Sequence, residues 1–234
     1  MSAPTPPELT PDALLGALAH ELRGPLNVCS MWLELLELNA ERPDEVRKAA
    51  QVMRRNIAHQ AKLIRELDDV ARLLGGGIEL EPTTVDLAAL LRGACDRWRA
   101  TAAERGVGFV DDLDAPGTLV EADEERLLQA LGYCVDNALA ATPAGGRVTV
   151  RLRRGDDHAE CAITDTGEGL DPAEVDRFFT APLQGPRRQK GLGLRLVIAR
   201  HIVGRHGGDL TIASAGAAHG CTLTVRLPLR GQHR

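Results

Sequence analysis

Apolar side chains recur at alternating steps of three and four in two stretches of the first third of the chain. This spacing is typical of long helices that pack along a coiled-coil-like seam. The first stretch repeats at Leu15, Leu18, Leu22, Pro25, Cys29, Trp32 and Leu36. The second repeats at Val46, Ala50, Met53, Ile57, Gln60, Ile64, Leu67, Ala71 and Leu74. A turn at residues 39–44 joins them, so the sequence predicts a helical hairpin.

The predicted hairpin has one apolar face and nothing of its own to bury it against. A second copy of the hairpin is the economical solution, because two copies close a four-helix bundle. We therefore expect a homodimer.

Three glycines at positions 75–77 end the second stretch, and Pro82 prevents the helix from continuing. The domain boundary is expected there. We assign residues 1–10 to a disordered N-terminus, 11–76 to the hairpin, 77–84 to a hinge and 85–230 to a second domain.

Helical and strand patterns alternate in the second domain. Helices are expected at residues 86–104, from 123 to before Pro143, and at 192–205. Strands are expected at 108–113, 119–121, 147–152, 159–165, 209–213 and 222–227. The predicted fold class is therefore α+β: a helical hairpin that forms a dimeric bundle, followed by an α/β sandwich with helices on one face of a single sheet.

The composition excludes several classes of partner. Aromatic residues make up only 3% of the chain and the net charge is −5, which argues against nucleic-acid binding. No stretch approaches the roughly 18 apolar residues that a membrane helix needs, and we expect no membrane contact. The five cysteines are widely spaced and odd in number, which favours reduced thiols and a cytoplasmic location.

His20 is the first candidate for chemistry. Its place in the repeat puts it on the outer face of the first helix, with Glu21 beside it to orient the imidazole or take its proton. A solvated surface histidine is the commoner explanation of such a residue. Gly24 and Pro25 interrupt the helix one turn later, and an irregularity there favours a functional role.

Three further segments suggest a phosphate or nucleotide ligand. Asp165 ends a strand and precedes Gly167 and Gly169, so its carboxylate can accept a hydrogen bond from an exocyclic amine. Residues 191–194, Gly-Leu-Gly-Leu, open a helix and favour anions. Asn137 offers an amide oxygen to magnesium. Each has an ordinary structural alternative, a tight turn or an exposed amide. The basic loop at 180–190, which includes Lys190, could meet nucleotide phosphates, although a solvated loop is the commoner explanation of such charges.

In order and spacing, these residues resemble the sensor histidine kinases of two-component systems. The phosphoacceptor box of that family is similar to His20-Glu21-Leu22-Arg23-Gly24-Pro25-Leu26. Its N, G1, F and G2 boxes are similar to Asp136-Asn137-Ala138, Asp165 to Gly169, Phe178-Phe179 and Gly191 to Leu194. Its closing strands are similar to His206 to Leu210, Gly220 to Leu223 and Leu227-Pro228. The resemblance covers about residues 9–229.

The resemblance implies a catalytic domain with a Bergerat-type ATP site of the GHKL ATPase/kinase type, and the cofactors ATP and Mg²⁺. Asp165 would bind the adenine amino group and Asn137 would hold the metal. Residues implied to contact the nucleotide are Asn137, Asp165, Gly167, Gly169, Lys190, Gly191, Leu192, Gly193 and Leu194. His20, with Glu21, would take the γ-phosphate and pass it to an aspartate in the receiver domain of a response regulator. Only 19 residues precede His20, so the signal is expected to come from a separate sensory input protein.

Four positions depart from the family pattern. Tyr133 replaces a usual Asn one turn before Asn137, and Ala140 replaces a frequent Lys or Arg. Gln189 replaces a glycine, and Gly24 replaces the Thr or Ser that aids dephosphorylation of the partner. The first three affect the expected kinase rate, and the last makes strong phosphatase activity unexpected.

Two other functions fit part of the pattern. A degenerate kinase would serve as a dimeric module that docks or sequesters a response regulator and binds nucleotide weakly, which Tyr133 and Ala140 favour. An ATP hydrolase of the gyrase, chaperone or mismatch-repair group would need a glutamate at position 133 to activate water. Tyr133 argues against the hydrolase.

Overall fold

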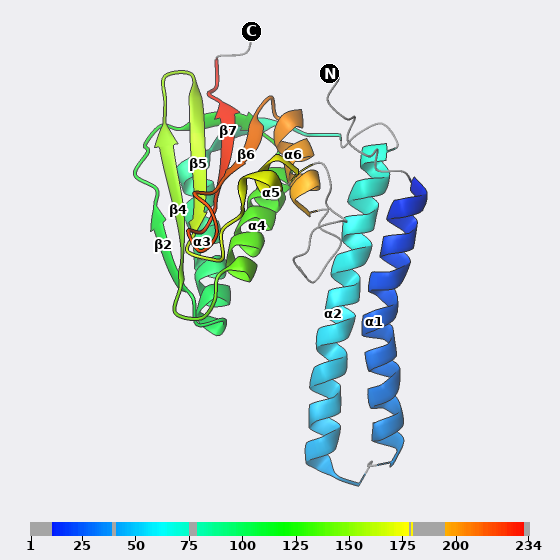
Figure 1. Ribbon diagram of the computed structural model, residues 1–234. Helices are drawn as coiled ribbons and strands as arrows, with labels where there is room; N and C mark the ends of the chain where they lie inside the picture. Colours follow the sequence, from blue (N-terminus) through cyan, green and yellow to red (C-terminus); the bar gives the residue numbers. More distant parts are fainter. Residues whose placement is uncertain (1–10, 39–40, 75–78, 178, 180–194, 232–234) are drawn as a thin grey trace. The chain divides into compact units, whose positions relative to one another are not determined.

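The computed structural model describes residues 11–38, 41–74, 79–177, 179 and 195–231 (Figure 1). These residues form two compact units. One holds helices α1 (Pro11–Leu38) and α2 (Pro43–Leu74), and the other holds every later element. The expected hairpin and sandwich are therefore both present, while the exact boundaries of the domains, the hinge and the N-terminal segment stay predictions.

The hairpin is held by a seam between α1 and α2. Gln60 Nε2 donates to the carbonyl of Leu22 at 3.3 Å, and the Cys29 thiol contacts the carbonyl of Met53 at 3.8 Å. On α1 the predicted seam positions whose side chains are described, from Leu22 to Leu36, are buried or half-buried. Pro25 is buried within a helix that continues past it, and Pro43 begins α2 instead of lying in the turn.

The predicted seam of α2 was partly wrong. Ala50, Ile57, Ile64 and Ala71 are exposed in the hairpin. The described seam instead follows Val46, Ala49, Met53, Asn56, Gln60, Leu63 and Leu67, again at steps of three and four. The sequence pattern had mixed two neighbouring apolar rows, one of which faces α1 while the other does not.

A five-stranded mixed sheet forms the second unit, in the order β2-β4-β5-β7-β6. Its strands are β2 (Gly108–Asp112), β4 (Arg147–Arg154), β5 (His158–Asp165), β6 (Asp209–Ala213) and β7 (Thr222–Pro228). Only β2 and β4 pair in parallel. Alternate residues such as Val150, Ile163 and Val225 are buried beneath the helices, as the period of two requires.

Helices α3 (Leu87–Glu104), α4 (Glu124–Ala141) and α6 (Arg195–Arg205) cover one face of this sheet (Figure 1). Aspartates begin two of them: Asp86 accepts from the N–H groups of Ala88 and Ala89, and Asp123 from that of Arg126. The sequence missed the short helix α5 (Pro172–Arg177) and the strand β1 (Thr83–Asp86). β1 pairs with β3 (Leu119–Ala122) in a separate two-stranded sheet, so the sheet is not single as expected.

A buried histidine joins the ends of α4 and α6. His206 Nε2 accepts a hydrogen bond from the backbone N–H of Asp123 at 3.0 Å. Because Nε2 accepts, Nδ1 carries the proton and donates to the carbonyl of Ile202 at 2.8 Å. This arrangement fixes the start of α4 against the last turn of α6.

Candidate functional site

Asp165, the last residue of β5, is the centre of the candidate site. Its side chain follows the inward-facing positions of the strand and is buried, with 3% of the residue exposed. Oδ1 accepts from the backbone N–H groups of Gly167, at 2.8 Å, and Cys221, at 3.2 Å. These two amides fix the orientation of the carboxylate plane relative to the strand.

The glycines around Asp165 make room for the protein's own backbone. A Cβ on Gly167 would lie 2.3 Å from the carbonyl oxygen of Ala141, at the end of α4. A Cβ on Gly220 would lie 1.9 Å from the carbonyl oxygen of Asp165, and Gly220 has a φ of +68°. We expected the missing side chain of Gly167 to let a ligand approach. The described contacts show that it also lets the loop after β5 pack against the end of α4.

Ser214 is a site residue that the sequence analysis missed. Its hydroxyl accepts from the N–H of Leu170 at 2.9 Å and donates to the carbonyl of Gly220 at 2.7 Å. The N–H of Ala218 also donates to the carbonyl of Glu168 at 2.6 Å. The loop between β6 and β7 therefore forms a second wall for the Asp165 loop. No local pattern signals these contacts, since the partners are 44 and 50 residues apart.

Asn137 lies on α4, half-buried, one turn before the end of the helix that Gly167 contacts. One turn earlier, Tyr133 is buried and its hydroxyl accepts from Gln129 Nε2 at 3.2 Å. Gln129 in turn accepts from Arg126 at 2.9 Å. Tyr133 is therefore an ordered part of this helix face, while Ala140 is exposed.

Arg195 is a second residue that the sequence analysis did not name. It begins α6, and its Nη1 lies 3.7 Å from Oδ2 of Asp136, the neighbour of Asn137. Both side chains are partly buried, with 22% and 30% exposed. This ion pair connects α6 to the turn of α4 that carries Asn137.

Several predicted site residues lie outside what the structure describes. His20 and Glu21 belong to α1, but their side chains are not described. Lys190, Gly191, Leu192, Gly193 and Leu194 lie outside the described residues, as do Gln189 and Phe178. Phe179 is described, and the Arg200 guanidinium lies 4.8 Å from the centre of its ring. Asn137 and Asp165 thus belong to one unit and His20 to the other.

Three cysteine thiols of the second unit have pKa values raised by burial. Burial raises the pKa of Cys95 to about 11 and that of Cys134 to about 12, and it also raises the pKa of Cys161. Among the described residues no disulfide joins the cysteines, and Cys29 is half-buried. Within the described part of the chain, no cluster of three His, Cys, Asp or Glu side chains is arranged to hold a metal ion.

Taken together, the fold and the site define a class: a helical hairpin followed by an α/β sandwich of the ATPase type. Two family models match the chain in that order. Residues 12–76 match the His Kinase A (phospho-acceptor) domain. Residues 122–231 match the histidine kinase-, DNA gyrase B- and HSP90-like ATPase, which is an ATP-binding family.

Sensor kinases of known name match most or part of this chain. The adaptive-response sensory kinase SasA of Rippkaea orientalis is 30% identical over 88% of this chain and 55% of its own length. The structure of the mycobacterial sensor histidine kinase MprB is 31% identical, with a TM-score of 0.56 over 64% of this chain and 99% of that one. The chain belongs to the sensor histidine kinase family. It spans between 37% and 58% of the length of three sensor kinases that it matches.

The fold is also found in the histidine kinase ThkA, solved in complex with the response regulator protein TrrA. That structure has a TM-score of 0.72 and 20% identity, over 95% of this chain and 63% of that one. It supports the predicted fold class, a hairpin followed by an α/β sandwich. As for membranes, none of the helices in the described residues is both long and apolar enough to span a bilayer.

Proposed function

We propose that this chain is an ATP-dependent protein histidine kinase that phosphorylates its own His20. One observation carries the proposal: a single chain joins a phosphoacceptor domain containing His20 to an ATP-binding domain with a buried, oriented Asp165. A carboxylate oxygen is a hydrogen-bond acceptor, and one fixed in orientation by two amides is suited to accept from the amino group of adenine.

The nucleotide would extend from Asp165 along α4 toward Asn137. Gly167 brings the Asp165 loop against the end of α4, and Asn137 lies one turn back along that helix. The amide oxygen of Asn137 is a suitable ligand for Mg²⁺, which takes oxygen ligands and completes its shell with water and phosphate. A bound Mg²⁺ would neutralise phosphate charge. Lys190 and residues 191–194 would contribute the remaining phosphate contacts.

His20 would be the nucleophile. A bond forms between an imidazole nitrogen and the terminal phosphorus, the bond from that phosphorus to the bridging oxygen breaks, and ADP leaves. Glu21 orients the imidazole or takes its proton. Catalysis of such a step consists mostly of positioning and charge neutralisation. The phosphoryl group would then pass to an aspartate in the receiver domain of a response regulator.

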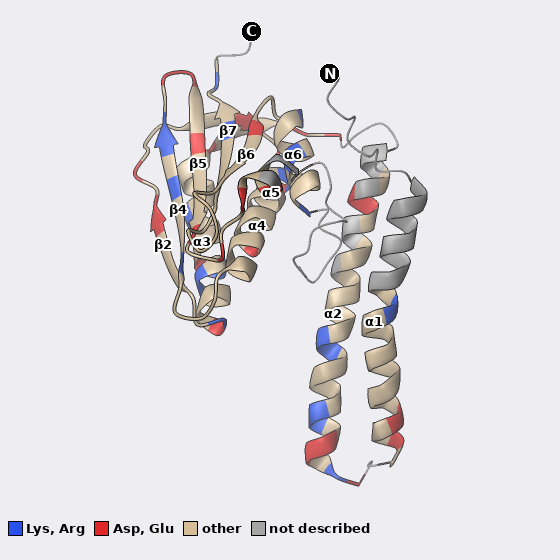
Figure 2. Cartoon of the chain, viewed as in Figure 1, with Lys and Arg blue, Asp and Glu red and all other residues tan. Residues whose placement is uncertain are grey.

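A homodimer would follow from an exposed apolar strip on the hairpin. Leu26 and Leu33 are spaced by seven residues on α1, and so are Ile57 and Ile64 on α2. All four are more than half exposed, and each follows a seam position directly. The residue that follows a seam position lies on one flank of its helix. In an antiparallel hairpin these flanks of the two helices lie on the same side, so the α1 pair and the α2 pair form one strip. α1 has no charged residue between Arg23 and Glu34, as Figure 2 shows. A second copy would bury this strip.

A degenerate kinase that docks a response regulator is the second candidate, because Tyr133 and Ala140 leave two usual phosphate contacts unfilled. One assay separates the two functions. The full chain is incubated with γ-labelled ATP and Mg²⁺, in wild-type form and as His20→Gln and Asn137→Ala. Acid-labile, base-stable label on the wild type alone supports the kinase. Nucleotide binding without label supports the docking module, and label that persists in His20→Gln overturns the proposal.

A further inference from the structure

The proposed nucleotide site needs a positive charge that α4 does not supply. The last thirteen residues of α4, from Gln129 to Ala141, contain no Lys, Arg or His. This stretch carries the negative charge of Asp136, and the loop that Gly167 brings against its end adds Asp165 and Glu168. A triphosphate bound along this helix would therefore lie among carboxylates, and a cation from another element would add to the charge that Mg²⁺ and Lys190 are proposed to supply.

Arg195 is the side chain of α6 that reaches this turn. It is 22% exposed and contacts Asp136, the residue next to Asn137. The separation of 3.7 Å makes the contact an ion pair and not a hydrogen bond. A guanidinium has five N–H donors in a planar fork, so it can pair with a carboxylate and bind phosphate oxygens at the same time.

We propose that Arg195 is a nucleotide-binding residue, which extends from α6 and donates hydrogen bonds to the phosphates near Asn137. This inference rests on the proposed function, since it assigns a residue to that same site. Asp136 pairs with the guanidinium when no nucleotide is bound, and its carboxylate would compete with the phosphates for it when one is. Phosphate binding would then connect α4 and α6 through a single side chain.

The test compares two ligands on the full chain with Mg²⁺. Chemical-shift titrations measure the affinity for the ATP analogue AMPPNP and for adenosine, which has no phosphate. Arg195→Ala should weaken AMPPNP binding about 10- to 100-fold, because charge-assisted hydrogen bonds are lost. Adenosine affinity should change less than twofold. Arg195→Lys keeps the charge but not the fork, so its loss should be intermediate.

Two control variants separate binding from structural support. Arg205→Ala removes an equal charge from the exposed last turn of α6 and should leave both affinities unchanged. Asp136→Asn breaks the ion pair but keeps Arg195, so AMPPNP binding should be retained or strengthened. If Arg195 only ties α6 to α4, Arg195→Ala and Asp136→Asn would weaken both ligands equally.

Each outcome decides a separate question. Unchanged AMPPNP affinity in Arg195→Ala, or an equal loss for adenosine, overturns the role of Arg195 and leaves the proposed function standing. A wild type that binds neither ligand overturns the proposed function itself. If Arg195→Ala fails to fold, Arg195→Lys and Asp136→Asn still give opposite expected changes.

Discussion

The two units of this chain differ in how many of their large apolar side chains are exposed. In the sandwich, the described large apolar side chains are buried or half-buried, except for Val110 and Leu119, which are exposed. Among its described side chains, the shorter hairpin exposes seven large apolar ones: Leu26, Met31, Leu33, Leu35, Leu38, Ile57 and Ile64. The sandwich therefore buries its core within one chain, whereas the hairpin leaves an apolar strip that the proposed second copy would bury. Its stability is expected to depend on association, and that of the sandwich on internal contacts.

Charge within the apolar strip should break the hairpin's association most strongly. Ile64→Asp changes one isoleucine in each copy, and the proposed dimer would bury both. Full burial of such a side chain contributes about 1.5–3 kcal/mol, so the dissociation constant should rise at least about 100-fold. Light scattering after size exclusion measures the mass. Leu38→Asp is the matched control, because Leu38 is 81% exposed and lies off the strip. An Ile64→Asp protein that stays dimeric at low concentration would contradict the account.

A methyl group at Gly220 should destabilise the sandwich alone. Its Cβ would lie 1.9 Å from the Asp165 carbonyl oxygen, at a φ of +68°. Gly220→Ala should cost about 2–4 kcal/mol of unfolding free energy in that unit. Gly93→Ala in α3 is the control: its added methyl group would meet no atom within 4 Å, and the change should stabilise by about 0.5–1 kcal/mol. Denaturant titrations of both variants check this, and equal effects would refute it.

Loss of the Ser214 hydroxyl should have a smaller effect. Ser214→Ala leaves the N–H of Leu170 and the carbonyl of Gly220 without this partner, which should cost about 1–2 kcal/mol and loosen the Asp165 loop. Nucleotide affinity should fall with it. Ser30→Ala in α1 removes only an exposed hydroxyl bonded to its own helix, so stability should change by less than about 0.5 kcal/mol. Thermal melts and nucleotide titrations measure both effects.

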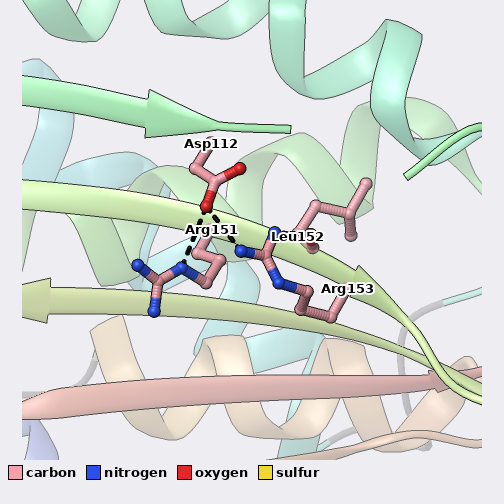
Figure 3. A network of polar contacts seen from close by, with 4 residues as sticks. All are labelled: Asp112, Arg151, Leu152 and Arg153. Carbon is pink, nitrogen blue, oxygen red and sulfur yellow. Dashed lines mark hydrogen bonds and ion pairs between the residues drawn. The ribbon is translucent and has the colours of Figure 1, made fainter. Parts of the chain in front are cut away.

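The smallest expected effect lies on the open face of the sheet. Asp112 accepts from Arg151 at 3.2 Å and from Arg153 at 2.5 Å, as Figure 3 shows. The hydrogen bond from Arg153, followed by that from Arg151, lowers the pKa of Asp112. A lowered pKa gives stability that is present above the unfolded value of about 3.9 and is lost as the pH falls through the folded value.

Asp112→Asn should therefore lower the melting temperature slightly at pH 7, and the difference should shrink at high salt and as the pH falls below about 4. Asp156→Asn, an exposed carboxylate in the turn between β4 and β5, is the control. A difference that grows as the pH falls would be inconsistent with the ion pairs.

The sequence predicted those features that depend on local periodicity. The α1 seam, the strand ends and the aspartates that begin α3 and α4 all follow from residues close together in the chain. The α2 seam was mixed with the apolar strip because Ala49 and Ala50, or Leu63 and Ile64, are equally apolar neighbours. Arg195 and Ser214 were missed for a different reason: their partners are distant in sequence, and only the folded chain brings them together.

Phosphorus NMR of the full chain after incubation with ATP and Mg²⁺ tests the central claim most directly. The account predicts a phosphoramidate signal, from phosphorus bonded to nitrogen, in the wild type. The signal should be absent in His20→Gln and strongly reduced in Asn137→Ala. A phosphoester signal, or a phosphoramidate that survives in His20→Gln, would contradict it.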